Sequence, residues 1–175
     1  MPVRVLGIDP GIALMGYGVI ENEDGRLTAI DFGCFSTTPA EPHAGRLRFL
    51  YEHLTALIDK HQPSEAAVEL FVARNLKTAL IVGQARGVAL LAAANRDIPV
   101  YEYSPLDVKQ SVTGYGRGSK EQVQELVKLQ LGLDAIPRPD DAADALAIAL
   151  CHIARIRLSR VLSGELNTGQ AGSRP

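Results

Sequence analysis

The stretch that most constrains the fold is the N-terminal segment 3–8, which is dominated by β-branched and other apolar side chains. This pattern predicts a buried strand. The carboxylate of Asp9 follows at once, and Pro10 and Gly11 end the strand. A carboxylate at the end of a buried strand loses hydration, at a cost of several kcal/mol unless a cation or another partner compensates. A simpler interpretation, in which Asp9 only caps the following turn, stays open here.

The bulk composition describes one globular domain. The chain has 175 residues, of which 46% are hydrophobic and 22% charged, enough to bury most of its apolar surface. No apolar run reaches the roughly 20 residues of a membrane span, and the N-terminus lacks a signal-peptide pattern. Cys34 and Cys151 are isolated, which argues against a disulfide framework and against a CxxC metal site. We therefore expect a cytoplasmic protein without a membrane partner.

Periodicity along the chain predicts an α/β domain. Strands are predicted at 3–8, 15–21, 27–35, 65–69 and 98–103, and helices at 43–61, 74–96, 105–112, 120–131 and 141–162. The first three strands are joined by short turns and should form an antiparallel meander. The complete order predicts a five-stranded mixed sheet with helices on both faces. Residues 163–175 are rich in Gly, Ser, Thr and Gln and should form a disordered tail.

The predicted helix 74–96 is apolar almost all round, so one of its faces needs a partner beyond its own sheet. Gly83 and Gly87 lie four residues apart and permit close helix–helix approach. A helix buried within a monomer and a homodimer interface both explain this pattern. We prefer the homodimer.

Two carboxylates near the start of the last helix are predicted to face inward. Asp141 and Asp144 are three residues apart and share one helix face, which continues through Ala145 and Ile148 toward the core. The helix dipole favours acids in the first turn and would suffice for Asp140. It explains Asp144 poorly, because the dipole effect fades beyond that turn.

Asp9 and Glu69 each end a predicted strand, and neighbouring strands lie about 4.8 Å apart. A helix packed on that edge would add Asp141 and Asp144. Such a cluster would repel itself unless hard divalent cations bind it, with Mg²⁺ favoured and Mn²⁺ as a substitute. Two such ions, about 4 Å apart, are the arrangement that hydrolyses phosphodiesters. Our hypothesis is that Asp9 and Asp144 hold one ion, and that Glu69 and Asp141 help to hold the other.

Several motifs together resemble the RuvC-type Holliday junction resolvases, or crossover junction endodeoxyribonucleases, over residues 3–155. The motifs are Gly7-Ile-Asp-Pro-Gly11, Gly16-Tyr-Gly18, Ala67-Val-Glu69, Gly83-Gln-Ala-Arg-Gly87, Val108-Lys-Gln110 and Asp141-Ala-Ala-Asp-Ala-Leu-Ala147. The resemblance implies a ribonuclease H-like nuclease domain over residues 1–162 and a homodimer. It implies Mg²⁺-dependent, symmetric nicking of four-way DNA junctions in recombination and repair. It also implies a RuvA–RuvB branch-migration partner.

The resemblance also implies roles for individual residues. The family's catalytic acids fall on Asp9, Glu69, Asp141 and Asp144, and its basic residues near the phosphate fall on Lys109 and Lys120. The family's aromatic wedge corresponds to Phe71, in a segment one residue shorter than the family pattern. Some members carry His at the position of Asp144.

Further cations are candidates for DNA phosphates. They are Arg74, Lys77 and Arg86 in the predicted helix 74–96, and Arg117 in the glycine-rich loop 114–118, which Lys109 and Lys120 flank. A solvated helix face is the simpler interpretation of any one of them. Phe71 is either a core residue at a strand end or an exposed ring that stacks on a base, which is worth about 1–3 kcal/mol.

Two other functions fit parts of the pattern. A sugar-kinase or actin-like ATPase also has a Gly-Ile-Asp strand, but it needs two such domains, so we expect no ATP hydrolysis. A non-catalytic junction-binding module would be expected to have lost one or more acids, whereas all four positions are acidic here.

Overall fold

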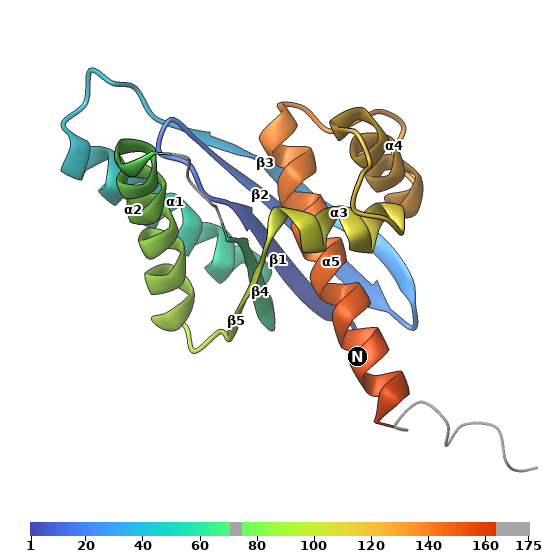
Figure 1. The fold of residues 1–175 in the computed structure, drawn as a ribbon. Coiled ribbons are helices and arrows are strands. Elements are labelled where there is room, and N and C mark those ends of the chain that lie inside the picture. Colours follow the sequence, from blue (N-terminus) through green and yellow to red (C-terminus); the bar gives the residue numbers. More distant parts are fainter. Residues whose placement is uncertain (71–74, 164–175) are drawn as a thin grey trace, which may run out of the picture.

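A five-stranded sheet with strand order β3-β2-β1-β4-β5 forms the centre of the computed structural model, which describes residues 1–70 and 75–163 (Figure 1). The strands are β1 (Val3–Asp9), β2 (Leu14–Glu23), β3 (Arg26–Ser36), β4 (Glu65–Glu69) and β5 (Val100–Tyr103). The first three form an antiparallel meander, and β4 and β5 run parallel to β1. The predicted mixed sheet is therefore confirmed.

Helices cover both faces of the sheet, as predicted. α1 (His43–His61) and α2 (Leu76–Ala94) lie on one face; α3 (Pro105–Thr113), α4 (Lys120–Leu131) and α5 (Asp140–Leu162) lie on the other (Figure 1). Successive residues of β1 point to opposite faces. Leu6 and Ile8 join the core beneath α1 and α2, whereas Val5 joins the core beneath α5.

Some predicted boundaries were wrong by one or two residues. The β2–β3 hairpin pairs down to Glu23 and Arg26, because Asp24 and Gly25 take the positive φ values of a tight turn. Asn75 caps α2, its side chain accepting a hydrogen bond from the Thr78 N–H at 2.9 Å, so the helix begins at Leu76. β5 begins only at Val100, after Pro99, which has no N–H to donate.

Two glycines let α5 lie directly on the sheet. A Cβ on Gly7 would lie 2.0 Å from the carbonyl oxygen of Ala145, and a Cβ on Gly16 would lie 2.1 Å from that of Asp141. Neither position therefore tolerates a side chain without moving the helix. Because Gly16 pairs with Asp9 across the β1–β2 ladder, this close packing brings the start of α5 to the end of β1.

α2 carries apolar surface that the described residues do not cover. Leu76, Leu80 and Leu91 are 75%, 60% and 54% exposed. Apart from neighbouring residues and the backbone of α2 itself, no described atom lies within 4 Å of a Cβ placed on Gly83 or Gly87. By length and composition alone α2 could also cross a membrane, but its buried alanines pack in the core beneath α1. α2 therefore packs on the core with one face and leaves an apolar face open to a partner molecule.

Candidate metal centre

Four carboxylates from three parts of the chain gather where β1 and β4 end. These strands are parallel neighbours with Ile8 paired to Val68, so Asp9 and Glu69 end them side by side. Asp141 lies in the first turn of α5, whose backbone packs on Gly16 beside Asp9. Asp144 follows on the same face of α5, close enough for its charge to act on both strand-end acids. The structure thus brings together the four acids predicted to be catalytic.

Two of the four acids border a groove of about 210 Å³ between β4, α3, α4 and α5. They are Glu69 and Asp144, and Lys109 and Lys120 line the groove with them. Its remaining lining is Pro105, Val108, Val123 and Ala147. The groove therefore holds two carboxylates and two ammonium groups, which suits a ligand that carries both cations and a phosphate.

Burial and mutual repulsion disfavour the charged forms of these acids. Burial, and then the charges of Glu69, Asp144 and Asp141, raise the pKa of Asp9 to about 8. Burial followed by the charge of Asp144 raises the pKa of Glu69. Burial also raises the pKa of Asp144, although Lys120 opposes it. Without a cation, Asp9 therefore keeps its proton at neutral pH.

The donor set fits a hard divalent cation. Carboxylate oxygens are the ligands that such ions prefer. The neighbouring thiol of Cys34 does not compete, because burial followed by the charges of Asp141 and Asp9 raises its pKa to about 11. Within residues 1–70 and 75–163, no three Asp, Glu, His or Cys side chains are already arranged as ligands of one ion. Coordination would therefore require side-chain movement, including movement of Lys120, which is ion-paired with Asp144.

Two lysines lie beside the acids. Lys109 on α3 lines the groove, and its charge acts to lower the pKa of Glu69 against the effect of burial. Lys120 is the first residue of α4, a helix begun by the capping box of Ser119 and Gln122. Its Nζ lies 3.4 Å from an oxygen of Asp144 and 3.4 Å from one of Asp140.

The sequence did not predict the contact between Lys120 and Asp140. The helix dipole was a sufficient explanation for an acid at position 140. That acid does lie in the first turn of α5. Its adjacency to Asp141 was visible in the sequence, but no local pattern pairs it with a lysine on another helix.

The other predicted DNA contacts lie away from the groove or outside the described residues. Lys77 is exposed in the first turn of α2, and Arg117 is exposed in the loop before α4; neither lines the groove. Arg86 forms an ion pair with Glu102 through one terminal nitrogen and does not line the groove. Phe71 and Arg74 lie outside the described residues, so the roles predicted for them stay predictions.

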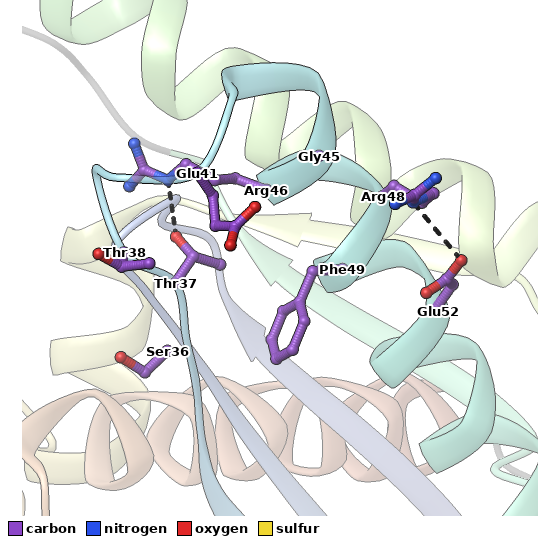
Figure 2. A pocket seen from close by; sticks show the side chains of 9 residues that line it. All are labelled: Ser36, Thr37, Thr38, Glu41, Gly45, Arg46, Arg48, Phe49 and Glu52. Atoms are coloured by element: carbon purple, nitrogen blue, oxygen red, sulfur yellow. Dashed lines mark hydrogen bonds and ion pairs between the residues drawn. The ribbon is translucent and has the colours of Figure 1, made fainter.

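A second hollow, of about 370 Å³, lies where the chain passes from β3 into α1 (Figure 2). Its two arginines are balanced by two glutamates, Glu41 and Glu52. Arg46 donates a hydrogen bond from Nε to Thr37 Oγ1 at 2.8 Å, and Arg48 Nε lies 3.9 Å from Glu52 Oε1. None of the four predicted catalytic acids lines this hollow, so the groove beside them is the candidate site.

Comparisons with known proteins point to one family. The family described as Crossover junction endodeoxyribonuclease RuvC matches residues 5–152. A protein of that name from Chloroflexus aurantiacus is 59% identical over 151 residues, which are 86% of this chain and 92% of the relative. Another, from Desulfitobacterium hafniense, is 53% identical over 163 residues, which are 93% and 99% of the two chains.

A solved structure shares the fold over nearly its whole length. It is Thermus thermophilus RuvC in complex with a Holliday junction substrate, at a TM-score of 0.86 and 37% identity. The match covers 90% of this chain and 96% of that one. It confirms the predicted ribonuclease H-like architecture.

Proposed function

Because the chain belongs to the crossover junction endodeoxyribonuclease RuvC family, we propose that it resolves four-way DNA junctions by metal-dependent hydrolysis of phosphodiester bonds. The gathering of Asp9, Glu69, Asp141 and Asp144 at one edge of the sheet carries this proposal. The Thermus thermophilus relative, which shares the fold, was solved with such a junction. No described feature favours a junction-binding module without catalysis.

The four acids would hold two Mg²⁺ ions, or Mn²⁺ in their place, with Asp9 and Asp144 on one ion and Glu69 and Asp141 on the other. When bound, such ions supply water activation and stabilisation of the leaving oxygen. Asp9 must first release its proton, since its pKa is raised to about 8 by burial and by the neighbouring acids. Acidic solution should therefore oppose loading of the site.

Lys109 and Lys120 would act on the phosphate. Both lie in the groove beside the acids. Burial acts to lower the pKa of Lys120, but Asp144 and Asp140 outweigh that effect and raise it, so its ammonium group stays charged. A fixed positive charge beside the scissile phosphate stabilises the charge that develops during hydrolysis. Lys77 and Arg117, which do not line the groove, would contact the DNA farther from the cut. Phe71 and Arg74 are further candidates for DNA contacts.

The symmetry of the substrate calls for two active sites related by a two-fold axis, and hence for a homodimer. We place its interface on the exposed apolar face of α2, which carries Leu80 and the open positions Gly83 and Gly87. The family further implies a RuvA–RuvB branch-migration complex as partner. A junction-cleaving enzyme of this family would work in the cytoplasm of a bacterial cell.

Replacing Leu80 by Glu should separate the dimer. An unpaired charge buried in an apolar interface costs enough to weaken association at least about 100-fold. Sedimentation velocity at working concentrations should show the wild type as a dimer and Leu80→Glu as a monomer that no longer makes paired nicks. Leu129→Glu, at a 68% exposed position on α4, is the matched control and should stay dimeric. A monomeric wild type, or a dimeric Leu80→Glu protein, would contradict this interface.

Metal removal tests the function itself. Purified protein should cut a synthetic four-way junction into two ligatable nicked duplexes in Mg²⁺, whereas EDTA should abolish the reaction. A linear duplex of the same sequence should stay intact, and ATP should not be hydrolysed. Junction binding without cleavage in both Mg²⁺ and Mn²⁺ would overturn the proposal.

A further inference from the structure

Lys120 is shared between two carboxylates, only one of which belongs to the proposed metal site. Its Nζ lies 3.4 Å from Asp144 Oδ2 and 3.4 Å from Asp140 Oδ2. By contrast, Lys60 lies 3.0 Å from Asp31, its ion-pair partner. Asp144 is the more buried of the two acids and attracts the ammonium group more strongly, because water screens the more exposed Asp140. Lys120 is nevertheless within ion-pair distance of both partners.

Asp140 is held in place independently of Lys120. Arg138 forms an ion pair with it. Asp140 also lies in the first turn of α5, where the helix dipole favours a carboxylate. Asp140 thus has a cationic partner of its own besides Lys120.

The pairing of Lys120 with Asp144 conflicts with the role proposed for that acid. A carboxylate neutralised by an ammonium group is a poorer ligand for a cation, since the two positive charges compete for the same oxygens. With Asp144 as its only partner, Lys120 would hold that ligand back. A second anchored carboxylate at the same distance gives the ammonium group another place while it stays in the groove.

We propose that Asp140 is a positioning residue, which receives Lys120 when Asp144 binds a cation and so keeps the lysine beside the phosphate. This inference rests on the proposed function. Asp140 acts through Lys120 and needs no contact with cation or DNA. Its effect should therefore depend on the presence of Lys120.

A double-mutant cycle on metal binding tests this dependence. Mn²⁺ affinity is measured by calorimetry on DNA-free full-length protein, for wild type, Asp140→Asn, Lys120→Met and the double variant. We expect Asp140→Asn to weaken Mn²⁺ binding about tenfold when Lys120 is present, and less than twofold in the Lys120→Met background. Asp140→Glu should restore wild-type affinity to within about threefold. Asp134→Asn, a change at an exposed acid outside the groove, should have no effect.

Other outcomes overturn the inference. If Asp140→Asn weakens Mn²⁺ binding equally with and without Lys120, Asp140 acts only as a general negative charge. If Asp140→Asn binds Mn²⁺ as tightly as the wild type or more tightly, Asp140 does not draw Lys120 away from Asp144. Single-turnover cleavage provides a second readout, because the rate of Asp140→Asn should fall most at limiting Mn²⁺, where the metal site is only partly loaded. Junction cleavage by the wild-type protein tests the proposed function by itself, so a failure of the double-mutant cycle overturns only the role of Asp140.

Discussion

Replacing Asp141 by Asn is expected to reduce junction cleavage at least about 10³-fold and to leave junction affinity within a few-fold of wild type. The amide keeps the size of the carboxylate but loses the charge that would hold a cation. Binding should survive, because it depends on cationic side chains that contact phosphates. Single-turnover cleavage in Mg²⁺ and a gel-shift titration in EDTA measure the two quantities separately.

The control for Asp141→Asn is Asp134→Asn, which removes the same charge at an exposed position outside the groove. It should cut at the wild-type rate. An Asp141→Asn protein that still cuts junctions would mean that the active site lies elsewhere.

Replacing Asp9 by Asn should make the metal-free protein more stable, by about 1–3 kcal/mol at pH 8. Burial and the surrounding acids raise the pKa of Asp9 from 3.8 to about 8 in the folded protein. Between these values the folded state holds a proton that the unfolded state has lost, so the free energy of unfolding falls as the pH rises. Asn carries no titrating group and avoids this loss.

Urea unfolding in EDTA between pH 4 and pH 8.5 measures the effect. The two proteins should differ least near pH 4, where Asp9 is protonated in the folded state and only about half ionised in the unfolded state, and should diverge as the pH rises. Mg²⁺ should then stabilise the wild type and leave Asp9→Asn unchanged, because only the wild type retains the complete site. An Asp9→Asn protein that is less stable than wild type across this range would contradict the electrostatic account.

These two results would express one property of the site. Charged groups gathered for function repel one another in the absence of their ligand, and the rest of the fold must offset that cost. Gly7 and Gly16 show how the fold does so, since their missing side chains let α5 lie tightly on β1 and β2. The same contact brings Asp141 to the end of β1.

The architecture and the acid cluster were predictable because both follow from local periodicity. Asp9 and Glu69 each end a predicted strand, and the three-residue spacing of Asp141 and Asp144 turns both toward the core. These positions predict that the acids meet at one edge of the sheet. The antiparallel meander likewise follows from short turns, whereas the strand order β3-β2-β1-β4-β5 was not predicted.

The environment of each acid was not predictable in the same way. The raised pKa of Asp9 depends on burial and on three charges brought in by other elements. The sharing of Lys120 depends on the packing of α4 against the start of α5, which no spacing within either helix reveals. The ion pair between Arg86 and Glu102 likewise joins α2 to β5, and no spacing within either element reveals it.

A crystal structure of the protein grown with Mn²⁺ tests the central claim most directly, because anomalous scattering locates the ion independently of the protein density. We expect peaks within about 2.5 Å of carboxylate oxygens of Asp9, Glu69, Asp141 and Asp144, with Lys120 moved from Asp144 toward Asp140. Peaks elsewhere on the molecule, with these four acids free of metal at saturating Mn²⁺, would contradict the account.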